Sequence, residues 1–211
     1  MGGSVKLGRF IVVFLFSVFL FLIATEEARC TSHVESQPNS LEPEVLKKPK
    51  PLIVYYSRTG NTRAISESIK NTLGCDIQEI KDLKDRSGFS GFIGGMIDVR
   101  ENPTTDISPT EVRLEDYNLL IIGSPGWGGK ITPAINTFIN MTDFTGKKVV
   151  LFSVVAGQMP QKTLDEYSEL IDSHGGQVID TFIIKTLWIN QDEMREEAKK
   201  ICTERKGKWM Q

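Results

Sequence analysis

The stretch LIVYYSRTGNTRAISESI, residues 52–69, decides how the rest of the chain is interpreted. It opens with an apolar, β-favouring run over residues 52–56, which predicts a buried strand. It then changes to Ser-Arg-Thr-Gly-Asn-Thr and continues with Ile65, Ile69 and Leu73 at helical spacing. A turn needs one or two small polar residues. A longer run of them between a strand and a helix points to a ligand.

Beyond this stretch, strand-like runs alternate with helical patterns to the end of the chain. LLIIG (119–123) and VVLFSVV (149–155) are continuously apolar, which is typical of strands covered on both faces. The predicted strands are 52–57, 76–80, 119–123, 149–155 and 178–184, with helices around 61–73, 89–97, 133–139, 164–171 and 194–202. Because right-handed βαβ crossovers bury both sheet faces, we expect an α/β fold with a doubly wound, five-stranded parallel sheet in three α/β/α layers.

The polar run lies where such a sheet binds ligands, at the carboxyl end of a strand. The following helix directs its unpaired N–H groups and its positive end into the same loop, which favours an anion. The hydroxyls of Ser57, Thr59 and Thr62 and the amide of Asn61 can donate to a phosphate, while Gly60 permits close backbone approach. The loop has neither the lysine of an ATP-binding loop nor the glycines of a dinucleotide fold. A monophosphate is therefore the predicted ligand, and a capped helix start without ligand is the alternative.

Because of this loop, the chain resembles the flavodoxin family. The family signature, a strand followed by Ser/Thr-x-Thr-Gly-x-Thr and a helix, is matched by residues 57–62. Ser66 stands where the family commonly has Ala. The resemblance covers about residues 52–205 and implies strand order 2-1-3-4-5 and bound FMN, with its phosphate in this loop.

The resemblance also implies ring contacts in two later loops. IIGSPGWGGKITPAI (121–135) follows the third strand, which we expect to end sharply at residues 123–125. Trp127 is expected to contact the isoalloxazine, and the alternative is a tryptophan that only packs on the surface. The loop after the fourth strand lacks the aromatic residue that many electron-carrying flavodoxins use. The predicted cofactor-binding residues are Ser57, Arg58, Thr59, Gly60, Asn61, Thr62, Ser124, Pro125, Gly126, Trp127, Gly128 and Gly157.

The connection between the second and third predicted strands, residues 82–116, is unusually long. Its helical pattern over 89–97 favours an ordinary helix covering the sheet. The alternative is a lid over a ligand at the sheet's edge.

The N-terminus differs in composition from the predicted domain. Lys6 and Arg9 precede the apolar run FIVVFLFSVFLFLIA (10–24), and Glu26, Glu27 and Arg29 follow. Residues 1–30 therefore predict a signal peptide or an uncleaved signal-anchor. Residues 31–51 predict a disordered linker, and 52–206 the flavodoxin-like domain. The charge bias places the domain outside the cytoplasm, secreted, periplasmic or membrane-anchored.

Composition and cysteine spacing exclude some classes of partner and site. The net charge of −2, without a basic stripe, excludes nucleic acid as an expected partner. Cys75 and Cys202 lack metal-ligand spacing and are predicted to be buried free thiols, and no metal site or catalytic residue is predicted. The resemblance implies electron transfer between FMN and a redox partner protein or small acceptor. The alternative is an NAD(P)H-dependent FMN oxidoreductase of the quinone-reductase type.

Overall fold

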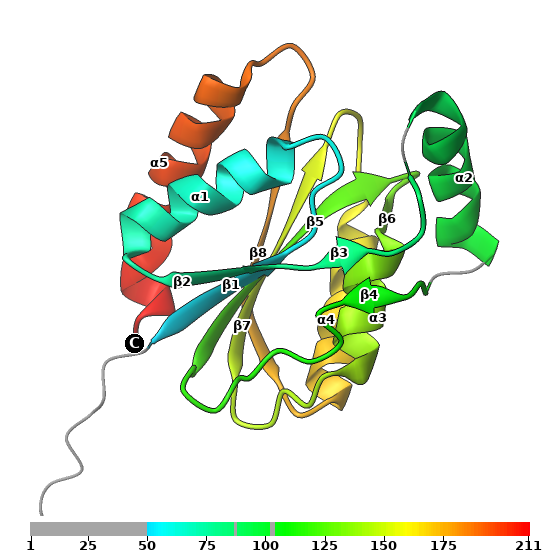
Figure 1. Ribbon diagram of the computed structural model, residues 1–211. Coiled ribbons are helices and arrows are strands. Elements are labelled where there is room, and N and C mark those ends of the chain that lie inside the picture. The colour runs from blue at the N-terminus through cyan, green and yellow to red at the C-terminus, as the bar shows by residue number, and fades with distance from the viewer. Residues whose placement is uncertain (1–49, 87, 102–103) are drawn as a thin grey trace, which may run out of the picture. The chain divides into compact units, whose positions relative to one another are not determined.

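The computed structural model describes residues 50–211 except residues 87, 102 and 103. Its central sheet is parallel and runs in the order β2-β1-β5-β7-β8 (Figure 1). These strands are β1 (Pro51–Tyr55), β2 (Asp76–Glu79), β5 (Leu119–Trp127), β7 (Lys148–Val155) and β8 (Gln177–Lys185). With the two-residue strands set aside, this is the predicted order 2-1-3-4-5, and the doubly wound fold is confirmed. The short strands are β3 (Lys81–Asp82), β4 (Ile107–Ser108) and β6 (Lys130–Ile131).

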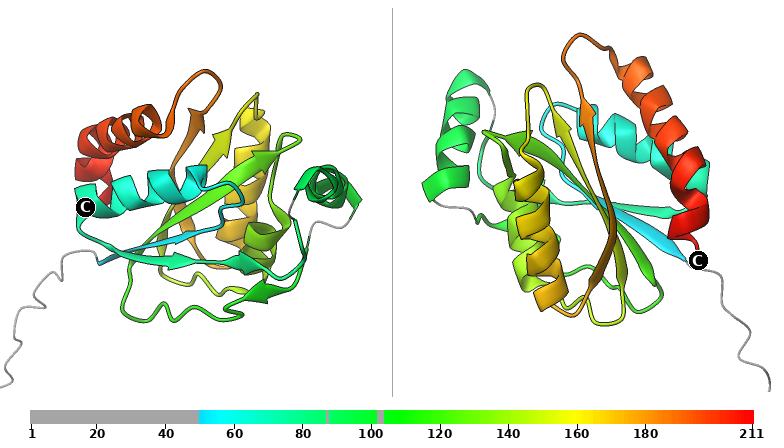
Figure 2. Two further views of the ribbon diagram at one scale, coloured as in Figure 1. Left: turned by 45° about the horizontal axis from the view of Figure 1, so that its top comes forward. Right: turned by 180° about the vertical axis from the view of Figure 1, so that it is seen from behind.

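Two pairs of helices cover the faces of this sheet (Figures 1 and 2). α1 (Asn61–Leu73) and α5 (Gln191–Trp209) lie on one face, and α3 (Pro133–Met141) and α4 (Gln161–Ser173) on the other. Each pair closes its own apolar cluster, because β1, β5 and β7 alternate their buried side chains between the two faces. The first cluster includes Ile53, Ile65, Ile121, Val150 and Ala198, and the second Val54, Ile122, Ile135, Leu151 and Leu164.

The helix of the long connection, α2 (Gly88–Glu101), lies elsewhere. Figures 1 and 2 show it beyond the carboxyl ends of the strands, next to the tip formed by β5 and β6, and not over a face of the sheet. The interpretation of this segment as an ordinary covering helix was therefore wrong. Gly91, Gly94 and Gly95 interrupt its apolar face, and α3 and α4 already cover that side of the sheet.

The last helix extends past the predicted domain end at residue 206. Trp209 is completely buried, and its indole N–H donates to the Asp180 carboxylate over 2.8 Å. Its ring stacks on Phe182, which in turn stacks on Phe152, with centroids 6.0 and 5.2 Å apart. This stack ties the C-terminal turn to the centre of the sheet.

Several predictions from the N-terminal sequence fall outside the described residues. They are the signal peptide or signal-anchor and residues 31–49 of the linker. Within the described ranges no helix is long and apolar enough to cross a membrane. Cys75 and Cys202 are buried free thiols, as predicted, and burial raises their pKa values to about 11 and about 12.

Candidate functional site

The loop between β1 and α1 lies at the carboxyl edge of the sheet. Gly60 is the N-cap of α1 and has a φ of +93°, a conformation that glycine adopts without strain. Its N–H donates to the Ser57 hydroxyl over 3.2 Å, which closes the loop into a tight turn. Since glycine has no side chain, the N-cap offers no acceptor to the first N–H groups of α1. These donors are therefore directed at the edge of the sheet, as in anion sites at helix N-termini.

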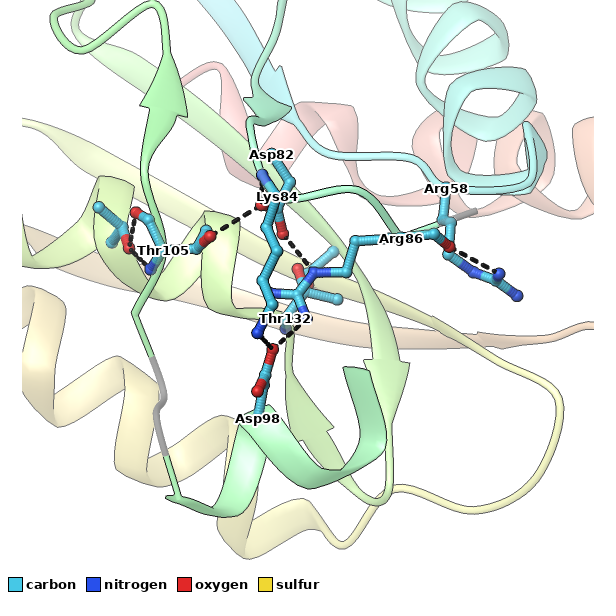
Figure 3. Close-up of polar contacts among 9 residues, drawn as sticks. Arg58, Asp82, Lys84, Arg86, Asp98, Thr105 and Thr132 are labelled. Atoms are coloured by element: carbon cyan, nitrogen blue, oxygen red, sulfur yellow. Dashed lines mark hydrogen bonds and ion pairs between the residues drawn. The ribbon is translucent and has the colours of Figure 1, made fainter. Parts of the chain in front are cut away.

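The side chains of this loop differ in exposure. Thr59 is exposed, Ser57 and Asn61 are partly buried, and Thr62 is almost fully buried. Side chains of the loop also contact distant segments. The guanidinium of Arg58 donates to the backbone carbonyl of Arg86 over 3.3 Å (Figure 3). The Asn61 side-chain carbonyl accepts a hydrogen bond from Gln191 at the start of α5, over 3.2 Å.

The second predicted loop proves to be largely strand. β5 continues through residues 123–125 to Trp127, so the expectation that the strand ends there was wrong. Pairing with β1 stops at Gly123, whereas pairing with β7 continues to Pro125. On the β1 side, no described strand pairs with β5 at Pro125, and proline has no N–H to donate to such a strand. The last residues of β5 then pair with β6 in a hairpin.

Ser124 and the nearby glycines have structural roles in this hairpin. The fully buried Ser124 hydroxyl accepts from the Thr132 N–H over 3.1 Å and shares a hydrogen bond with its hydroxyl, fixing the start of α3. Gly128 and Gly129 have φ values of +57° and +77°, as a two-residue β-hairpin turn of type I′ requires. A Cβ at Gly126 would lie 2.4 Å from Val155, so close packing alone calls for glycine there.

Trp127 is mostly buried, with 8% of its surface exposed. Its ring meets Tyr56 edge-on, with centroids 6.0 Å apart, and the Arg86 guanidinium lies 5.7 Å from the ring centroid. Another close neighbour is Gly95 of α2, where an added Cβ would lie 2.7 Å from the ring. The indole therefore packs against α2 and Tyr56, and its wide apolar face is largely covered.

An ion-pair cluster that the sequence analysis missed holds α2 in this position (Figure 3). Arg86 is 5% exposed, donates to Asp82 over 2.7 Å and is also hydrogen-bonded to Asp98 of α2. Lys84 reaches the same Asp98 oxygen over 2.6 Å, and Thr105 donates to Asp82 over 2.8 Å. The hydrogen bonds from Lys84 and then Arg86 hold the pKa of Asp98 below its usual value.

The sequence carries only a weak signal for this cluster. Asp82 and Arg86 are four residues apart with opposite charges, which is a common surface pattern. Nothing in their spacing indicates that the pair is buried or that Arg86 lies over an aromatic ring. Burial, with the charge of Asp82 next, raises the pKa of the neighbouring Tyr56 to about 12, so its hydroxyl stays protonated at neutral pH.

The third predicted contact, Gly157, is exposed in the loop after β7. An added Cβ would meet nothing within 4 Å there, so packing does not call for glycine at this position. This loop, the hairpin at Trp127 and the β1–α1 loop all lie at the carboxyl edge (Figure 1). The topology therefore brings the three predicted segments to one edge.

A cavity of about 600 Å³ lies beside the β1–α1 loop. Its lining includes Ser57, Tyr56 and five basic side chains against three acidic ones: Arg58, Arg63, Lys81, Lys84 and Arg86, with Glu79, Asp82 and Asp85. A cavity of similar volume near Met141 and Lys147 lies at the opposite edge, where the parallel strands begin. That second cavity is remote from the three loops.

The residues present fit an FMN phosphate. The start of α1 supplies N–H groups that no N-cap side chain occupies, and Ser57, Thr59, Asn61 and Thr62 add neutral donors. The left-handed Gly60 allows close approach, since a Cβ there would meet only the Gln191 side chain at 3.6 Å. Such a donor set can hold a phosphate dianion without a lysine.

Comparisons with known proteins agree with this geometry. A sequence model of the family described as flavodoxin matches residues 50–187. A flavoprotein from Lactobacillus acidophilus, solved in complex with FMN, is 22% identical with a TM-score of 0.58, covering 77% of this chain and 99% of its own. A candidate flavoprotein from Bacteroides uniformis is 21% identical with a TM-score of 0.59, covering 72% and 99%. At these identities the structures show likeness of fold. No curated protein matches the chain.

Proposed function

This chain belongs to the flavodoxin family of FMN-binding flavoproteins, and we propose that it is an electron carrier that holds the FMN phosphate in the β1–α1 loop. The observation that carries the proposal is the start of α1, where Gly60 leaves the first N–H groups without a side-chain acceptor at the carboxyl edge of the sheet. Ser57, Thr59, Asn61 and Thr62 are the proposed side-chain donors to the phosphate. Arg58 lies beside them, and its contact with Arg86 holds the loop against the following segment.

When bound, FMN supplies the one- and two-electron chemistry, and the chain positions it and tunes its potentials. We propose that the Gly157 peptide turns toward the ring, since even an added Cβ there would meet nothing within 4 Å. At the hairpin we propose that backbone groups of Pro125, Gly126, Trp127 and Gly128 face the ring, since the Trp127 indole is held by α2 and Tyr56. The buried Ser124 hydroxyl stabilises this hairpin by accepting a hydrogen bond from the Thr132 N–H.

We propose a redox protein or a small electron acceptor as the partner, in the extracytoplasmic setting that residues 1–30 predict. The competing proposal is an NAD(P)H-dependent FMN oxidoreductase. The observation in its favour is the cavity beside the phosphate loop, where basic side chains outnumber acidic ones. A nicotinamide dinucleotide is anionic and would suit such a lining.

One experiment separates the carrier from the oxidoreductase. The FMN-loaded protein is followed by visible absorption under anaerobic conditions, first with NADH or NADPH and then with dithionite. A carrier keeps its flavin bands with the nicotinamides and loses them with dithionite. Rapid bleaching by either nicotinamide favours the oxidoreductase, and Lys81→Ala, on the cavity wall, would then be expected to raise the KM for that nucleotide. Failure to take up FMN at all overturns both proposals.

A further inference from the structure

The loop between β8 and α5 carries a tryptophan in an unusual setting. Trp188 is 91% exposed, and its φ of +72° makes it the one non-glycine residue with a positive φ in the described part of the chain. Bulky side chains rarely adopt this conformation. Backbone outliers of this kind gather at ligand sites, where the surroundings hold them in place. Here the strained backbone displays an indole to solvent instead of burying it.

Both ends of this loop are fixed to segments of the proposed FMN site. At its start, the N–H of Thr186 donates to the Val155 carbonyl over 2.8 Å, next to the loop that carries Gly157. At its end, Asn190 caps α5 in a reciprocal capping box. The next residue, Gln191, donates to Asn61 of the phosphate loop. The loop that carries Trp188 is therefore tied at one end to the last residue of β7 and at the other to the phosphate loop (Figure 1, the orange loop at the top).

Two other segments among the described side chains are unsuited to an aromatic contact. Trp127 is held against Tyr56 and Gly95, and residues 155–160 contain no aromatic side chain. Among the described side chains, Trp188 is the one aromatic among the exposed large hydrophobic residues. A site for a flat, apolar ring system is thus bordered by a single accessible indole.

We propose that Trp188 covers one face of the isoalloxazine of FMN, supplying from the β8–α5 loop the aromatic surface that the loop after β7 lacks. This inference rests on the proposed function. Stacking two flat aromatic systems removes both apolar faces from water, and it requires no hydrogen-bond pairing from the indole. The exposed indole and the fixed ends of its loop are what such a contact needs, because little ordering of the loop is required on binding.

The direct test uses the full chain labelled with 5-fluorotryptophan and ¹⁹F NMR. The chain has three tryptophans, so three resonances are expected, and Trp188→Phe assigns one of them. Without FMN the Trp188 resonance should show the full H₂O/D₂O solvent shift of an exposed ring. On adding FMN it should move and lose that solvent shift. The buried Trp209, at the opposite end of α5 from Trp188, is the internal control.

Binding constants of variants give a second measurement. Trp188→Ala should raise the Kd for FMN and for riboflavin by the same factor, about tenfold, because the contact is to the ring and not to the phosphate. Trp188→Phe should restore most of the affinity. Leu187→Ala, which alters the exposed neighbour, is the matched control and should change either Kd less than twofold.

The outcomes separate this inference from the proposal beneath it. If FMN binds but the Trp188 resonance keeps its position and solvent shift, and Trp188→Ala keeps the wild-type Kd, then Trp188 does not cover the ring and the FMN proposal stands. A Trp188 resonance that responds only to an added redox partner protein would also overturn the inference, in favour of a docking role. If wild-type protein takes up no FMN, both are overturned.

Discussion

Ser66 shows how a single residue departs from the family pattern at a cost that can be measured. Its side chain is fully buried on α1, and its hydroxyl has no hydrogen-bond partner in the described structure. An unsatisfied buried hydroxyl destabilises the folded state, and Ala is also the better helix former. Ser66→Ala should therefore raise the free energy of unfolding by about 1 kcal/mol. Urea unfolding of the two proteins checks this, and a lower value for the variant would indicate a partner for the hydroxyl.

Ser57 tests the phosphate loop with the same chemical change. Its hydroxyl accepts from the Gly60 N–H and is a proposed donor to the phosphate. Ser57→Ala should weaken FMN binding about tenfold, the loss of one hydrogen bond to a charged group. It should leave riboflavin binding unchanged, because riboflavin has no phosphate. Ser66→Ala is the matched control, and equal losses for both flavins in Ser57→Ala would contradict a phosphate role.

At the scale of elements, the position of α2 depends on its packing against Trp127. Gly95 leaves room for the ring, whereas an added Cβ at Gly94 would meet nothing within 4 Å. Gly95→Ala should therefore lower the free energy of unfolding by about 1–3 kcal/mol through overpacking. Gly94→Ala should raise it by about 0.5–1 kcal/mol through helix propensity. Chemical unfolding followed by tryptophan emission measures both, and equal effects of the two variants would contradict the position of α2.

The ion-pair cluster gives the attachment of α2 a dependence on pH. The hydrogen bonds from Lys84 and Arg86 lower the pKa of Asp98 in the folded protein relative to about 3.9 in the unfolded chain. A carboxyl group with a lowered folded-state pKa stabilises the fold above its unfolded pKa. This contribution is lost as the pH falls through the folded value. Asp98→Asn should cost about 1–3 kcal/mol at pH 7 and progressively less as the pH falls below about 4. A pH-independent cost would rule out this account of the attachment.

At the scale of the whole molecule, the sequence predicts the parts that depend on local patterning. The continuous apolar runs at residues 119–122 and 149–155 predict central strands. The glycine after Thr59 predicts the start of a helix at the carboxyl edge. The extension of β5 to Trp127 was not predictable in the same way. It depends on pairing with β7 and β6 after β1 has ended.

The missed features of the site share a physical cause. The burial of Trp127, the burial of Arg86 and the exposure of Trp188 are tertiary outcomes, decided by which distant segment covers which side chain. A glycine at residue 95 gives no sign in the sequence that a ring lies against it. The sequence thus predicts the edge where we propose that FMN binds, whereas the structure is needed to identify which tryptophan is exposed.

We propose that this fold holds FMN by its phosphate at the start of α1. Titrating the flavin-free protein with FMN and with riboflavin, followed by flavin fluorescence, tests it most directly. We expect one FMN per chain and at least tenfold weaker binding of riboflavin, because several N–H and O–H donors act on the phosphate alone. Equal affinity for the two flavins, or no uptake of FMN, would contradict it.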